Sequence, residues 1–225
     1  AGRAVVDTST RPPRFTGHFS APMLDLRGLF AGTGDADAPA DGRVFPDTPL
    51  PWRALDLGHA DVKLQAGAVK LARNLAATEL KGHATLANGT LRLHEFGATL
   101  GGGRITATAE AHGRAEPPRI QATVQAESID YGRLLADAGI SDAVQGKARI
   151  DVDVAARGRS PRALASTLSG ELAVIGDAGR IDHALVTAAS AGLNDLLAPW
   201  RDTGKDVTLT CAVAKFTAKN GTLDS

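Results

Sequence analysis

The fold is decided by the stretch Lys147-Ala148-Arg149-Ile150-Asp151-Val152-Asp153-Val154, in which polar and apolar residues alternate without interruption. Successive side chains of a β-strand point to opposite faces, so a period of two is typical of a half-buried strand. One face of this strand would carry charges and meet water, and the other would carry aliphatic side chains. The stretch therefore predicts a sheet with one polar and one apolar face.

The same alternation recurs on both sides of this strand, with turn signals between the segments. Asn88-Gly89 is a strong hairpin signal, because both central residues of a type I′ turn have positive φ. Gly67 is also interpreted as a turn, and residues 208–216 as a last strand. About ten to twelve strands joined by tight turns predict a mainly β fold. We expect a long, curved, antiparallel sheet with a few short α-helices.

Three helices are predicted, near residues 130–138, 161–168 and 182–198. Asp130 can cap the first helix, and Ser160-Pro161 supplies an N-cap followed by proline at the first helical position of the second. Prolines interrupt residues 1–58, which predicts a leading strand and an extended linker with an acidic Gly/Ala-rich loop at 32–42. Residues 59–225 form the predicted sheet domain. Both ends of the sequence indicate a segment of a longer chain.

The composition argues against several classes of protein. The chain has 25 Lys and Arg and 25 Asp and Glu residues, and a nucleic-acid binder usually carries a basic excess. No apolar run approaches the roughly 20 residues of a membrane-spanning helix. The lone Cys211 excludes an internal disulfide, and its apolar neighbours predict a small buried side chain rather than a nucleophile.

The sequence contains no recognised catalytic motif. It has neither the G-x-S-x-G of a nucleophile elbow nor a phosphate-binding G-x-x-x-x-G-K-[ST], and none of its six histidines lies in H-E-x-x-H. His83, His94 and His112 could approach one another across a sheet, but solvated polar-face positions are the favoured interpretation. Similarly, an acidic loop in water is favoured over a calcium site for the aspartates of 32–42. We expect no enzyme activity, no metal and no cofactor.

The apolar face of the sheet is the candidate functional surface. Small side chains such as that of Ala107 would leave room for an acyl chain on this face. Burial of each methylene of such a chain contributes about 0.8 kcal/mol to the binding free energy. Periodicity reports only burial, so the same residues could instead pack together as a closed core. The candidate lining residues are Val62, Leu64, Leu86, Leu91, Leu93, Ile105, Ala107, Ile120, Val124, Ile150, Val152, Val154, Leu172 and Val174.

Four segments, in order along the chain, resemble the C-terminal region of AsmA-family proteins. The first resembles the family's G-x-L-S-x-P-x-L-D-L-x-x-L pattern, the third its L-x-x-G-x-L-x-L followed by L-x-G-G-x, and the fourth its L-x-C-x-V-A-R-F followed by D-G. The second is a proline-interrupted entry into an alternating strand. These segments are residues 17–29, 44–71, 86–104 and 209–221.

This resemblance implies an envelope protein of Gram-negative bacteria that faces the periplasm and is held to the inner membrane by an anchor outside this segment. It implies a taco-like sheet whose apolar groove handles phospholipid acyl chains in lipid transport and outer-membrane assembly or homeostasis. No catalytic residues accompany it. A structural or regulatory module that contacts outer-membrane assembly proteins is the alternative, and an enzyme acting on glycans is disfavoured.

Overall fold

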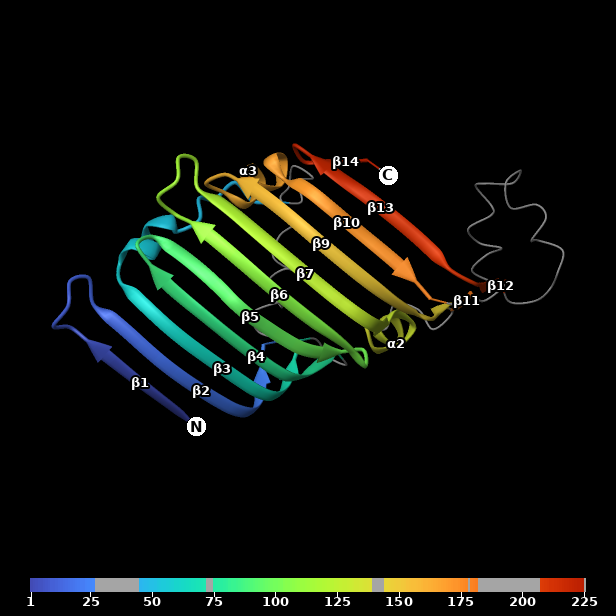
Figure 1. Cartoon of the computed structure of the whole chain (residues 1–225), viewed down its shortest axis with the longest axis horizontal. Coiled ribbons are helices and arrows are strands. Elements are labelled where there is room, and N and C mark those ends of the chain that lie inside the picture. The colour runs from blue at the N-terminus through green and yellow to red at the C-terminus, as the bar shows by residue number, and fades with distance from the viewer. Residues whose placement is uncertain (27–44, 72–74, 139–143, 178, 182–206, 225) are drawn as a thin grey trace.

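The computed structural model of the chain describes residues 1–26, 45–71, 75–138, 144–177, 179–181 and 207–224. Its main feature is an open sheet of 11 strands in the order β1-β2-β3-β4-β5-β6-β7-β9-β10-β13-β14 (Figure 1). The strands of this sheet are β1 Gly2–Asp7, β2 Arg14–Asp25, β3 His59–Lys70, β4 Ala76–Ala87, β5 Thr90–Leu100, β6 Gly103–His112, β7 Arg119–Asp130, β9 Lys147–Arg157, β10 Ser169–Gly176, β13 Ala212–Lys219 and β14 Thr222–Asp224. The prediction of a long, mainly β sheet is confirmed, and the two leading strands belong to the same sheet.

Neighbouring strands of this sheet are antiparallel, except that β2 and β3 are parallel. The sheet is therefore mixed. A parallel pair cannot be joined by a tight turn, and residues 26–58 form the long connection that this pair requires. A second, three-stranded sheet contains β8 Val144–Gln145, β11 Gly179–Ile181 and β12 Val207–Leu209.

Two predicted Asn-Gly hairpins are present. Asn88 and Gly89 have φ values of 52° and 74°, and Asn220 and Gly221 have φ values of 50° and 77°. The predicted turn at Gly67 is wrong, because β3 runs through this residue without reversing. A Cβ at Gly67 would lie 2.9 Å from the backbone oxygen of Pro22 on the parallel neighbour β2, so the glycine permits close approach of two strands.

Two of the three predicted helices are confirmed. They are α2, Tyr131–Asp137, and α3, Pro161–Thr167, whose N-caps are Asp130 and Ser160 as expected. The helix predicted at 182–198 and the acidic loop at 32–42 lie outside the described residues. Sequence reasoning missed a short 3-10 helix, η2, at Trp52–Asp56. None of the described helices is long and apolar enough to cross a bilayer.

The predicted last strand, 208–216, is divided between the two sheets. β12 ends at Leu209 in the small sheet and β13 begins at Ala212 in the large one, so the chain leaves one sheet for the other at Cys211. Cys211 is exposed, and the prediction that it is buried is therefore wrong. The apolar residues on either side of Cys211 led to the prediction of one continuous strand, although the strand is interrupted there.

Ser160 connects the linker before β3 to the segment that follows the C-terminal end of β9. Its Oγ accepts a hydrogen bond from the Ala163 backbone N–H at 3.2 Å and donates one to Asp47 Oδ1 at 2.7 Å. The Leu50 backbone N–H also donates to the Arg159 oxygen at 2.8 Å, and Arg114 Nε lies 2.6 Å from Asp56 Oδ1. These contacts hold residues 45–58 along one end of the sheet.

We expect Ser160→Ala to lower the free energy of unfolding by about 1–2 kcal/mol, because Ser160 is 4% exposed and both bonds would be lost. Urea denaturation followed by circular dichroism measures the change. Ser166→Ala is the matched control, since the exposed hydroxyl of Ser166 makes one hydrogen bond within the same helix, to the Ala163 oxygen. An equal loss in both variants would contradict a capping role for Ser160.

A cluster of buried residues forms a small core at one end of the sheet. It consists of Ala66, Val69, Ala77, Leu80 and Ala98, with Leu24, Leu26, Leu64, Leu71, Phe96 and Leu100 packed around it. The other buried apolar residues are Ala126, Ile129, Ala148, Ala156 and Ala218. The ends of β2, β3 and β4 bend out of the plane of the sheet there (Figure 1). Leu64 and Phe96 lie on the apolar face of the sheet, so the bend curves the sheet toward that face.

Candidate functional site

The strand register places all fourteen candidate lining residues on one face of the sheet. Paired residues of adjacent strands point to the same face, so each ladder partner extends a row of side chains across the strands. One such row contains Leu64, Gly82, Phe96, Ala107, Val124, Val152, Leu172 and Phe216, one residue from each of eight successive strands. The apolar rows therefore run across the strands and connect segments far apart in sequence.

Three further rows of this face run alongside the first. The second contains Val62, Ala84, Leu93, Ala109, Ala122, Val154, Gly170 and Ala218. The third contains Ala60, Leu86, Leu91, Ala111, Ile120 and Ala156, and the fourth Ala98, Ile105, Ala126, Ile150, Val174 and Ala214. Small and large side chains are mixed within each row, and none of these residues is charged.

Phe96 is a residue of this face that sequence reasoning missed. A β-bulge in β5 inserts His94, since Ala84 pairs with Leu93 whereas the preceding His83 pairs with Glu95. The extra residue reverses the alternation, so Phe96 and Ala98 join the face of Leu93. Two consecutive polar residues, His94-Glu95, followed by an aromatic residue were the signal of the bulge in the sequence.

Among the described residues, no second layer buries the candidate lining residues. Thirteen of the fourteen are half-buried, and Leu91 is exposed at 39%. A closed core would bury most of these side chains, as it buries Val69 at 0% exposure. In the part of the chain that the structure describes, the face is therefore not packed as a closed core: alanines such as Ala126 are buried between larger neighbours, and the large side chains form an open apolar surface.

The opposite face is polar, and many of its charges form ion pairs between or along strands. Arg92 Nη2 lies 2.8 Å from Glu110 Oε1, and Lys215 Nζ lies 3.1 Å from Glu171 Oε2. Arg149 Nε lies 2.8 Å from Asp151 Oδ2, and this contact raises the pKa of the Arg149 guanidinium. Such a face is stable in water without a covering layer.

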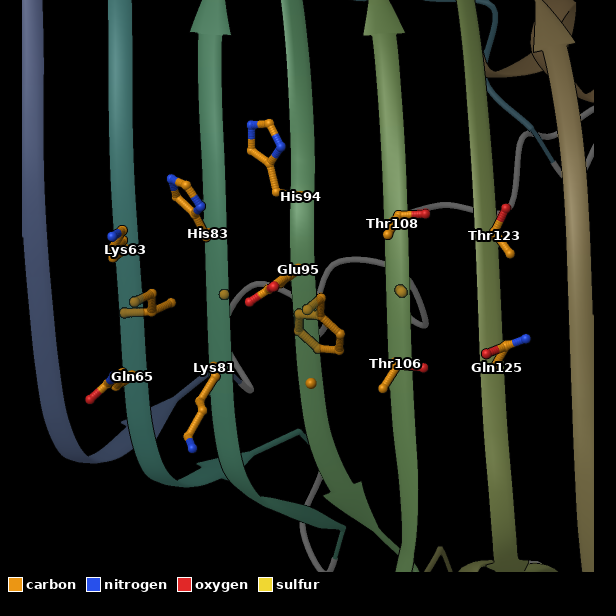
Figure 2. Close-up of a pocket in the computed structure, with 15 residues that line it drawn as sticks. Lys63, Gln65, Lys81, His83, His94, Glu95, Thr106, Thr108, Thr123 and Gln125 are labelled. Carbon is orange, nitrogen blue, oxygen red and sulfur yellow. The ribbon is translucent and has the colours of Figure 1, made fainter.

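A hollow of about 520 Å³ opens on this polar face over β3 to β7, and we call it the polar hollow (Figure 2). Its polar side chains are Lys63, Gln65, Lys81, His83, His94, Glu95, Thr106, Thr108, Thr123 and Gln125. The ring centroids of His83 and His94 lie 5.0 Å apart, and the planes are inclined by 28°. His112 instead lies 3.3 Å from Glu110 Oε1, so the structure brings together two of the three histidines.

A metal centre is not formed by these side chains. In the part of the chain that the structure describes, no group of three or more His, Cys, Asp or Glu residues is arranged to hold an ion. His83 Nε2 lies 3.0 Å from Asp61 Oδ1, and His94 Nε2 lies 2.7 Å from Thr85 Oγ1. Each ring is thus oriented by a neighbour on its own face.

Comparisons of the sequence with known proteins identify a family. The family model described as "AsmA family" matches residues 27–225. The chain is 23% identical over 188 residues to "AsmA family protein YhjG" of Escherichia coli (strain K12), covering 84% of this chain and 27% of that protein. No solved structure matches. Because the family model covers most of the sequence, the chain belongs to the AsmA family.

Proposed function

We propose that this chain binds phospholipid acyl chains on its open apolar face and so contributes to lipid handling in the bacterial envelope. Membership of the AsmA family indicates an envelope-related function. The observation that carries the proposal is the uncharged face of four continuous rows, whose large side chains stay half-exposed. An uncovered apolar surface of this extent in water is typical of an interaction site.

The dimensions of the face suit acyl chains. Adjacent strands lie about 4.8 Å apart, so the row from Leu64 to Phe216 across eight strands is roughly 34 Å long. The hydrocarbon core of a bilayer is about 30 Å thick and holds two leaflets, so one extended chain occupies roughly 15 Å. The row could accommodate about two chains end to end, and it requires no specific polar contact because each buried methylene contributes about equally.

The uneven relief of the face favours flexible chains over a flat protein partner. Gly82 lies between Leu64 and Phe96 in its row, and a Cβ added there would have no atom within 4 Å. This gap and the alanines beside it leave space between larger side chains. A flexible chain can follow such a surface at little cost, whereas a rigid partner would need a matching shape.

Single-cysteine labelling tests where lipid binds. In a Cys211→Ser background, Val152→Cys and Asp153→Cys place an environment-sensitive fluorophore at adjacent positions of β9 on opposite faces. With phosphatidylglycerol vesicles, we expect a blue shift of emission at position 152 and little change at position 153. Equal responses at both positions, or none, would contradict lipid binding by the apolar face.

The alternative is a structural or regulatory module that acts through contacts with outer-membrane assembly proteins. It is supported by the same uncovered face, which a protein could also contact. Mass spectrometry of the purified protein separates the two functions, because a lipid carrier retains phospholipid through purification. Anchorage to the inner membrane and a periplasmic location belong to the proposal, and fractionation of cells expressing the parent protein tests them.

A further inference from the structure

Three charged side chains line the polar hollow without an ion-pair partner among the described residues. They are Lys63, Lys81 and Glu95. The neutral side chains around them, Gln65, Thr106, Thr108 and Gln125, likewise form no side-chain hydrogen bond among the described residues. The hollow therefore presents two ammonium groups and several free hydrogen-bond donors to solvent.

The hollow exists because one position in a polar row has no side chain. Gly97 pairs with Lys81 on one side and with Thr106 on the other. A Cβ added at Gly97 would have the Ile105 backbone oxygen as its nearest atom, at 4.0 Å, so the space above this residue is open. The bulge at His94 brings an additional imidazole to the rim, where it stacks on His83.

From this arrangement we infer that the polar hollow binds a phosphate group carried on a hydroxyl- or amine-bearing molecule. The two lysines supply positive charge, and the threonine hydroxyls and glutamine amides supply donors to phosphate oxygens. Glu95 lines the same hollow and accepts hydrogen bonds from the hydroxyl or amine of the carrier. Glu95 would not stabilise a bare phosphate anion. A phosphate ester with a hydroxyl or amine group is therefore expected to bind more tightly than inorganic phosphate.

The two imidazoles complete the site. Nε2 of each ring is engaged by Asp61 or Thr85, whereas Nδ1 of each ring has no partner among the described residues. When protonated, Nδ1 is a further donor to an oxyanion. The hollow lies on the opposite face from the apolar rows, so its ligand is separate from any acyl chain bound there.

Titration followed by the ¹H–¹⁵N signals of the His83 and His94 side chains tests this site. The probes are inorganic phosphate, glycerol 3-phosphate and phosphoethanolamine, added to the purified chain. We expect saturable shifts of both rings, with phosphoethanolamine and glycerol 3-phosphate binding more tightly than inorganic phosphate. Lys63→Ala and Lys81→Ala should each weaken binding about 3- to 10-fold.

Two glycines provide a matched steric pair. Gly97→Leu should abolish the shifts by filling the hollow, whereas Gly176→Leu, on the apolar face of β10 and outside the hollow, should leave them unchanged. Lys215→Ala, on the same polar face but beyond the hollow, should also have no effect. Circular dichroism checks that each variant is folded.

The origin of the phosphate is distinguished by repeating the titration with phosphatidylglycerol vesicles. Shifts that Gly97→Leu removes with vesicles indicate a lipid headgroup, and shifts that it removes with the soluble probes alone indicate a free phosphoester. Shifts that are linear in every probe, or that persist in Gly97→Leu, would overturn the inference. So would saturation by Zn²⁺ without any response to phosphate.

Discussion

Ala107→Asp is expected to reduce the phospholipid retained by the purified protein about tenfold or more. Ala107 lies in the middle of the apolar row from Leu64 to Phe216, between Phe96 and Val124. A carboxylate at this position must be desolvated when an acyl chain lies over it, and burial of an unpaired charge costs several kcal/mol. Lipid extraction and mass spectrometry, normalised to protein, measure the effect.

Ala155→Asp is the matched control for this substitution. Ala155 is exposed on β9 and points to the polar face, where it pairs with Gln121 and Ser169. The same change is made on the face that already meets water and outside the polar hollow, so lipid retention should not change. Equal losses in the two variants would show that the charge acts on the whole protein and not on the apolar face.

Val69→Asp is expected to lower the free energy of unfolding by about 3–5 kcal/mol, because a carboxylate at this position would be buried without a partner. Val69 is 0% exposed and lies in the core cluster at the bend of β2, β3 and β4. A loss of this size is a large fraction of the total stability of a typical domain. Urea denaturation with near- and far-ultraviolet circular dichroism measures it.

Val213→Asp introduces the same change at an exposed position. Val213 is 70% exposed and lies on β13, near one edge of the sheet. We expect a change within about 0.5 kcal/mol, since the carboxylate stays in water. If the two variants were equally destabilised, the small cluster around Val69 would not be the stabilising core of this sheet.

The two predictions separate apolar residues that stabilise the sheet from those that remain open. Val69 and Val152 are both aliphatic residues next to a charged residue in a strand, and these local features do not show which of them is buried. The difference arises because the ends of β2, β3 and β4 bend over one end of the apolar face and cover it there (Figure 1). Residues beyond the bend lie on the uncovered part of the face.

Local signals predicted the strands and turns well, because they depend on neighbours in sequence. Alternation places Ile150, Val152 and Val154 on one face whatever lies beside β9, and Asn88-Gly89 specifies its turn through φ alone. The errors occurred where a distant segment decided the outcome. Gly67 is a point of close approach to Pro22, and Cys211 lies at a passage between two sheets.

The sequence by itself determined that this protein has a long sheet with one apolar and one polar face, since a period of two needs no tertiary contact. Tertiary structure decided that the apolar face is an open surface and not a closed core, because periodicity is identical in the two cases and exposure is not. Tertiary structure also determines that the polar hollow exists. His83, Gly97 and Thr106 are brought together only by the register of three strands and by the bulge at His94.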